Sequence, residues 1–207
     1  MRNITEKEMQ FVLTIARSLE TEYSANSIAK RLKMSAMGAL KIAKKLEKEE
    51  IIIGRNLGRG RFYNLNVKND YAQQYVKFLL KREAEQSHPY VKSWITQLKK
   101  ITQADLIIIF GSVLRKHEHA QDIDVLFVMN QKQFSGLKKE IEGINLVNLK
   151  KIHAIYQTKK DIEKNIKKND SVVLNVVKGV VVRGEDLLLE ILAKNEPSKK
   201  QAYMVLE

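Results

Sequence analysis

Residues 107–130, IIIFGSVLRKHEHAQDIDVLFVMN, decide the fold of the second half of the chain. The apolar run up to Phe110 indicates a buried strand, Gly111–Ser112 a turn that opens a short helix, and DIDVLFV a second strand. Residues two apart in a strand point to the same face, so Asp122 and Asp124 project together. Neighbouring carboxylates repel each other unless a cation lies between them. The stretch therefore predicts a divalent metal held by Asp122 and Asp124.

The composition favours a polyanionic partner. The 207 residues include 37 Lys and Arg against 24 Asp and Glu, a net charge of +13, and no Cys. Such a balance suits nucleic acid or nucleotides, although a Lys-rich surface that serves solubility or heat resistance gives the same numbers. Without Cys, disulfides and thiolate metal sites are excluded. No apolar run approaches the ~18 residues of a membrane span and the start lacks a signal-peptide core, so we expect a cytoplasmic protein with no membrane partner.

The first 66 residues carry the pattern of a small helical domain with a hairpin. Apolar periodicity predicts three helices, the first capped by Thr5 and the third, over residues 36–50, capped by Ser35. The β-prone runs IIIGR and RFYNLN, joined by NLGRG, then predict a hairpin. Three helices followed by a hairpin is the order of a winged helix-turn-helix. Residues 4–66 resemble the winged-helix domains of archaeal and bacterial transcription regulators.

This resemblance implies DNA binding by residues 1–66. The third helix would enter the major groove, and the hairpin, as the wing, would reach phosphates or the minor groove. The cations expected to contact DNA are Lys41, Lys44, Lys45, Arg55, Arg59 and Arg61. Two alternatives stay open: these cations form an ordinary solvated face, or the domain binds protein.

The rest of the chain is expected to form a connector, a second domain and a tail. Residues 67–98 predict two helices separated at Pro89, whose apolar stripe is either core or a homodimer contact. In residues 99–195 strands alternate with helices, which is typical of a sheet covered by helices. Residues 196–207 read as a polar tail. The expected fold class is α+β: a winged helix-turn-helix domain followed by a mixed β-sheet flanked by helices.

The stretch FGSVLRKHEHAQDIDVLFV resembles the signature of the DNA polymerase β-like nucleotidyltransferase superfamily, and is most similar to its minimal nucleotidyltransferase domains. The signature is a strand ending in Gly-Ser, a short helix, and a strand carrying Asp-x-Asp. The resemblance implies Mg²⁺ or Mn²⁺ on Asp122 and Asp124, and an NTP as substrate or ligand on Gly111, Ser112 and Arg115. The residue types suit this chemistry, since glycine lets phosphate approach the backbone and carboxylates bind hard cations.

One part of the family pattern is missing from this chain. Active members usually carry a third carboxylate on the next strand, where it completes a metal site and takes a proton. Here that strand is KIHAIYQ, in which His153 is the only side chain that titrates near neutral pH and could serve as a base. Two functions therefore stay open: a Mg²⁺-dependent nucleotidyltransferase, or a DNA-binding transcriptional regulator whose nucleotidyltransferase domain senses nucleotide. A third, suggested by the resemblance to minimal nucleotidyltransferases, is an antitoxin-like partner of a HEPN toxin.

Overall fold

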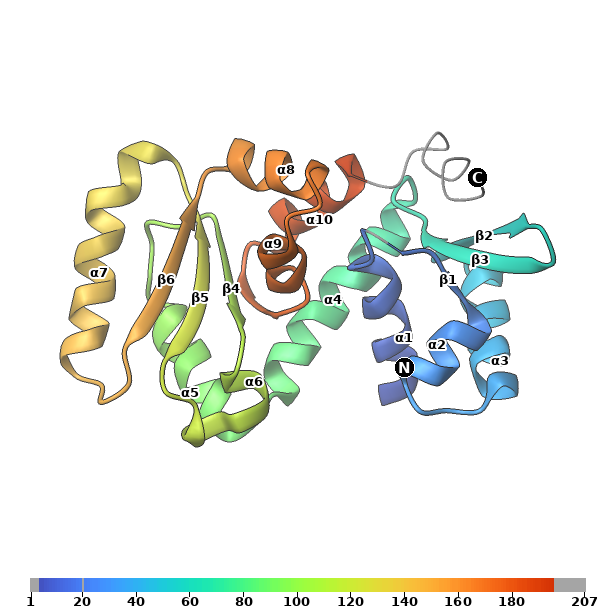
Figure 1. The fold of residues 1–207 in the computed structure, drawn as a ribbon, viewed down its shortest axis with the longest axis horizontal. Coiled ribbons are helices and arrows are strands. Elements are labelled where there is room, and N and C mark those ends of the chain that lie inside the picture. Colours follow the sequence, from blue (N-terminus) through green and yellow to red (C-terminus); the bar gives the residue numbers. More distant parts are fainter. Residues whose placement is uncertain (1–3, 20, 196–207) are drawn as a thin grey trace. The chain divides into compact units, whose positions relative to one another are not determined.

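The computed structural model describes residues 4–19 and 21–195, in two compact units (Figure 1). One unit ends at Leu79 and the other runs from Leu80 to Asn195. The polar tail expected at 196–207 lies outside the described residues.

The first unit has the order of elements of a winged helix-turn-helix. Its elements up to residue 65 are α1 (Glu6–Ala16), β1 (Tyr23–Ser24), α2 (Ala25–Arg31), α3 (Ala36–Lys48), β2 (Ile52–Leu57) and β3 (Gly60–Leu65). The side chains of Thr5 and Ser35 accept hydrogen bonds from the backbone N–H of Glu8 and Gly38, which confirms both predicted helix starts. The short strand β1 was not expected. It pairs antiparallel with β3 and widens the hairpin to a sheet in the order β1-β3-β2.

A buried carboxylate joins three helices of this unit. Glu8 of α1 is 3% exposed, and it accepts hydrogen bonds from Tyr75 Oη at 2.8 Å and from Lys45 Nζ at 2.9 Å. Tyr75 belongs to α4 (Asp70–Gln86) and Lys45 to α3. A buried charge needs partners of this kind because its desolvation is costly. Glu8 therefore has two roles: its backbone N–H donates to Thr5 at the start of α1, and its carboxylate lies in the interior.

The two helices expected as a connector contribute to cores. In α4, Tyr75, Val76 and Leu79 are buried, whereas Tyr71 and Phe78 are about half exposed. Pro89 opens α5 (Pro89–Leu98), where its missing N–H costs nothing. The apolar stripe of α5 packs into the core of the second unit, so core is the correct alternative for that helix. A homodimer contact stays a prediction for the exposed side chains of α4.

The second unit is built on a mixed four-stranded sheet. Its strands are β4 (Leu106–Phe110), β5 (Ile123–Val128), β6 (Ile152–Gln157) and β7 (Val180–Arg183), in the order β6-β5-β4-β7. The β4 strand pairs antiparallel with β5 and β7, and β5 pairs parallel with β6. The expected α+β class, with a mixed sheet flanked by helices, is confirmed.

Helices cover both faces of this sheet (Figure 1). Alternate residues of β4 and β5, among them Ile107, Ile109 and Val125, pack with α5 and α7 (Phe134–Leu146). The strands also contact α8 (Lys159–Lys167), α9 (Ser171–Val176) and α10 (Glu185–Lys194). The short helix α6 (Val113–Lys116) and two 3-10 turns, His117–His119 and Gln131–Gln133, complete the unit. Among the described helices, none combines the length and apolar character needed to cross a membrane.

Replacing Glu8 by Ala is expected to lower the free energy of unfolding by about 1–3 kcal/mol, because the buried hydrogen bonds from Tyr75 and Lys45 to this carboxylate are lost. Chemical denaturation followed by circular dichroism measures this change. The matched control is Glu6→Ala, which removes an exposed carboxylate from the same turn of α1. Equal stability of the two variants would contradict the role assigned to Glu8.

Candidate metal centre and nucleic-acid interface

The register of the sheet brings polar side chains to one end of β5. Asp122 immediately precedes β5 and Asp124 lies within it, so their side chains leave the same face of the sheet. That face is opposite the one on which Val125 and Phe127 join α5 and α7. Asp124 is paired with Phe110 of β4 on one side and with His153 of β6 on the other. The parallel pairing of β5 and β6 therefore sets an imidazole beside the carboxylates.

Asp122, Asp124 and His153 form a compact group of ligand atoms. One ligand atom from each lies within 4.8 Å of the other two, and His153 Nδ1 is 2.9 Å from Asp124 Oδ1. The side chain of His153 is 66% exposed and that of Asp124 is 21% exposed, so solvent reaches the group. Within residues 4–19 and 21–195 no other cluster of three or more His, Asp or Glu side chains has this geometry. The arrangement suits a divalent cation.

Electrostatics in this group favour a protonated imidazole. The hydrogen bond to Asp124 raises the pKa of His153 above its ordinary value, and the charges of Asp124 and Asp122 act in the same direction. A positive imidazolium partly offsets the repulsion between the two carboxylates. When protonated, His153 places a positive charge beside the two carboxylates.

The Gly111–Ser112 turn lies against the same carboxylates. Gly111 has a φ of +80°, and a Cβ at this position would come within 2.2 Å of Asp124 Oδ2. Glycine is thus required both by the backbone conformation and by the space. Ser112 precedes α6 without a capping hydrogen bond from its side chain, so its hydroxyl is available to a ligand. Arg115 is exposed on α6 and makes no ion pair among the described residues.

No third carboxylate joins the cluster within the described part of the chain. Asp161, which follows β6, instead completes a capping box with Thr158 at the start of α8. The sequence identified His153 as a candidate base but did not predict that it lies beside Asp122 and Asp124. The signal that could have done so is strand register, since a parallel neighbour of β5 starting at Ile152 sets His153 opposite Asp124.

The six cations predicted to contact DNA fall into two groups. Lys45 pairs with Glu8, Arg55 with Glu22, and Arg61 with Glu47. Lys41, Lys44 and Arg59 are exposed and make no ion pair with any described residue. The first three form ion pairs within the unit, and of the six only the second three lack an ion pair with a described residue.

The three unpaired cations lie on the surface that a winged helix presents to DNA. Lys41 and Lys44 share a face of α3 with Met37, whose side chain is 75% exposed near the start of that helix. Arg59 lies at the tip of the wing, in the two-residue turn between β2 and β3 that begins with Gly58 at a φ of +56°. The paired Arg61 connects the wing to α3 through Glu47. This surface is electropositive, and the exposed side chain of Met37 makes it apolar at the start of α3.

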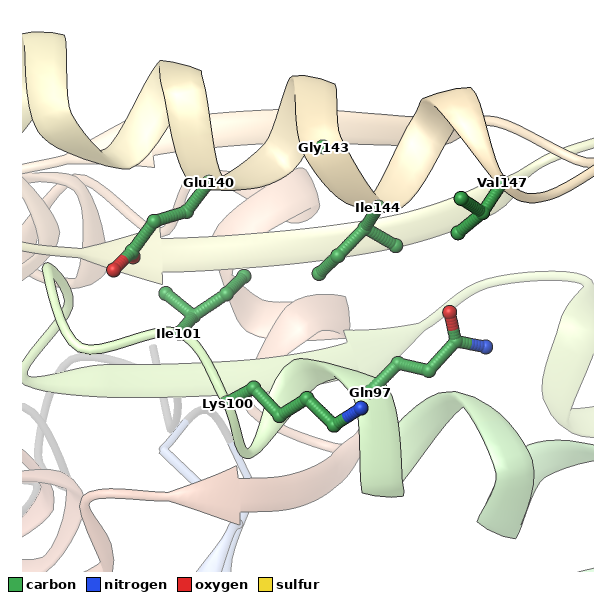
Figure 2. Close-up of a pocket in the computed structure, with 7 residues that line it drawn as sticks. All are labelled: Gln97, Lys100, Ile101, Glu140, Gly143, Ile144 and Val147. Atoms are coloured by element: carbon green, nitrogen blue, oxygen red, sulfur yellow. The ribbon is translucent and has the colours of Figure 1, made fainter.

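Two hollows of the second unit lie away from Asp122, Asp124 and His153. The smaller, of about 300 Å³, is lined by Gln97, Lys100, Ile101, Glu140, Gly143, Ile144 and Val147 (Figure 2). Its carboxylate, Glu140, accepts hydrogen bonds from the backbone N–H of Thr102 and of Gln103. The larger, of about 1040 Å³, includes Phe134 and Tyr156, which meet edge to face. Neither lining includes Asp122, Asp124 or His153.

Two solved structures are similar to part of this chain. No protein-family profile matches it, and no curated protein matches it. Two crystal structures of the adhesin competence repressor AdcR from Streptococcus pyogenes, one of them C-terminally His-tagged, match with 16% sequence identity and a TM-score of 0.36. The match covers 48% of this chain and 69% or 68% of theirs. A similarity of this extent identifies neither a family nor a function.

In the metal-free protein, we expect the pKa of His153 to lie above 6.5, and Asp124→Asn to lower it because the charged partner is lost. With a raised folded-state pKa, the stabilising effect of the pair is fully present below the unfolded-state pKa and is lost as the pH rises through the folded-state value. NMR titration of the imidazole signals measures the pKa of His153 in the parent and in Asp124→Asn. The control is Glu118→Gln, which removes an exposed carboxylate outside the cluster. An unchanged pKa of His153 in Asp124→Asn would rule out the pairing.

Proposed function

We propose that the chain is a DNA-binding regulator whose second unit binds a nucleoside triphosphate together with a divalent cation. The observation that supports DNA binding is the set of unpaired, exposed cations on α3 and at the wing tip. Such a regulator needs access to DNA, in keeping with the cytoplasmic location expected from the sequence. A HEPN-type protein partner stays a prediction.

The proposed DNA contact uses α3 and the wing in different ways. With α3 in the major groove, residues near its N-terminus meet base edges, where the exposed thioether of Met37 suits the methyl group of thymine. Lys41 and Lys44, farther along the same face, suit phosphates. Arg59 reaches the flanking phosphates or minor groove from the wing tip. The ion pairs of Arg55 and Arg61 hold the wing in place, so those arginines act on binding through the shape of the domain.

The proposed nucleotide site is the end of the sheet where Gly111–Ser112 meets Asp122 and Asp124. The triphosphate would lie over the glycine turn, with the hydroxyl of Ser112 as a donor and the carboxylates holding the cation that bridges to the phosphates. The mixed sheet and the order of its strands are compatible with the nucleotidyltransferase resemblance. Arg115 is close in sequence and adds positive charge on the same short helix. The DNA-binding unit would then respond to whether nucleotide is bound.

A second function, nucleotidyl transfer, is favoured by the position of His153. In that reaction the oxygen of an acceptor hydroxyl forms a bond to the α-phosphorus, the bond to the bridging oxygen breaks, and pyrophosphate leaves. The proton of the hydroxyl must pass to a base. His153 is exposed beside Asp124 and could accept it when neutral. Incorporation of label from an α-labelled NTP into a hydroxyl acceptor tests this second function.

Replacing Lys41, Lys44 and Arg59 together by Ala is expected to weaken binding to duplex DNA of any sequence, because unpaired cations contribute mainly phosphate contacts. The slope of log affinity against log salt concentration should become shallower by about 2–3, since each lost phosphate contact reduces the magnitude of this slope by about 0.9. Fluorescence anisotropy over a range of salt concentrations measures both quantities.

The matched control for the DNA measurement is Lys68→Ala. Lys68 is an exposed lysine of the same unit, and it follows β3 at the end away from the wing tip. The control should bind as the parent does. If the triple variant and the control bind DNA equally, or if the parent does not bind DNA, the first unit is not a DNA-binding domain of this kind.

Asp122→Asn combined with Asp124→Asn is expected to abolish divalent-dependent NTP binding while the protein stays folded, because the amides keep the volume but lose the charge that holds the cation. Equilibrium binding of a fluorescent NTP, with and without metal, measures the effect, and thermal unfolding checks the fold. Glu118→Gln, which changes a nearby acid outside the cluster, should bind as the parent does. Unchanged NTP affinity in the double variant would remove the site assignment.

A further inference from the structure

We infer that His153 is the third protein ligand of the cation, and that it makes the site select a first-row transition-metal dication over Mg²⁺. This inference rests on the proposed function, in which Asp122 and Asp124 hold a cation. It goes beyond that proposal by naming a nitrogen ligand and the class of metal.

The first support is positional. His153 reaches the cluster through the parallel pairing of β5 with β6, in which it is the direct partner of Asp124. Its neighbours Ile152 and Ala154 pack on the core on the opposite face, so the alternation of the strand fixes the side on which the imidazole lies. The fold of the sheet therefore fixes the imidazole beside Asp124.

The second support is the spacing of the ligand atoms. Two atoms bound to one cation at about 2.0–2.2 Å lie at most about 4.4 Å apart. The group as it stands fits within 4.8 Å, so rotations of the three side chains can bring its atoms around one ion. His153 Nδ1 and Asp124 Oδ1, 2.9 Å apart, already have a separation that neighbouring ligands of one ion can adopt. A cation that takes both atoms displaces the hydrogen bond between them.

The third support is ligand chemistry. Mg²⁺ prefers an all-oxygen environment, whereas imidazole suits transition metals, whose affinities for such sites follow the order Mn²⁺ < Fe²⁺ < Co²⁺ < Ni²⁺ < Cu²⁺ > Zn²⁺. Two carboxylates and one imidazole are a mixed set that Mn²⁺, Co²⁺ or Zn²⁺ accepts. Three protein ligands also leave coordination positions for phosphate oxygens and water, as a site that receives a nucleotide requires.

The assignment bears on the choice between regulator and transferase. A nitrogen that binds the cation has no lone pair left for the proton of an acceptor hydroxyl. Within the described residues no carboxylate completes the cluster in its place. A site in which His153 is a ligand therefore holds metal and nucleotide without that side chain as a base, as a sensing role requires.

The test is binding of Mn²⁺ alone to the full-length, metal-free protein, followed by EPR, with Mg²⁺ as the competitor. The parent should prefer Mn²⁺ over Mg²⁺, and His153→Asp, which restores an all-oxygen set, should bind metal with a preference reduced by about tenfold or more. Pulsed EPR of the bound Mn²⁺ should show coupling to an imidazole nitrogen. His153→Gln should lose this coupling, whereas His119→Gln, in an exposed histidine outside the cluster, should keep it.

Bound Mn²⁺ without nitrogen coupling in the parent, or equal Mn²⁺-to-Mg²⁺ preference in the parent and His153→Asp, would overturn the inference. Failure of the parent to bind either metal would overturn it as well. The nucleotide proposal fails separately: nitrogen-coupled Mn²⁺ on a protein that does not bind the fluorescent NTP would refute nucleotide binding and leave the metal assignment intact.

Discussion

The proximity of Asp122 and Asp124, whose like charges repel, is the constraint on which the proposed site of the second unit depends. Asp124 is held in place by the pairing of β5 with β4 and β6, and Asp122 immediately precedes the strand, so the two carboxylates lie close together. The structure offsets this repulsion with the imidazole of His153, whose pKa the hydrogen bond to Asp124 raises. It also leaves room beside them, because Gly111 has no side chain to fill the space against Asp124. An acidic pair kept open in this way is suited to a cation and to the phosphates that a cation attracts.

Charge is used differently in the first unit. Its ion pairs join elements: Glu8 connects α1, α3 and α4, and the pair of Arg61 with Glu47 connects the wing to α3. Cations with such partners are poor candidates for phosphate contacts, because binding DNA would require them to leave a carboxylate. Lys41, Lys44 and Arg59 have no such cost within the described chain. The net charge of +13 is therefore a poor guide to how many cations of this unit can contact a polyanion, because several of them already pair with carboxylates.

Much of the fold followed from local patterns. Capping by Thr5 and Ser35, the apolar and β-prone runs of the strands, and the Gly58–Arg59 turn could be predicted because each depends on neighbours in the chain. What depends on distant residues was not readable: the pairing of β1 with β3, the burial of Glu8 under Tyr75, and the partners that engage half of the predicted DNA-contacting cations. The same limit applies to His153, whose meeting with Asp124 is set by the register between two strands that α7 separates in sequence.

The most direct measurement of the central claim is anomalous diffraction from crystals grown with Mn²⁺ and a non-hydrolysable NTP analogue. The account predicts one strong Mn²⁺ peak about 2.0–2.4 Å from an oxygen of Asp122, an oxygen of Asp124 and a nitrogen of His153, with phosphate oxygens in the remaining positions. An ordered analogue bound elsewhere, or a cluster that stays without a peak while its hydrogen bond between His153 and Asp124 persists, would contradict it.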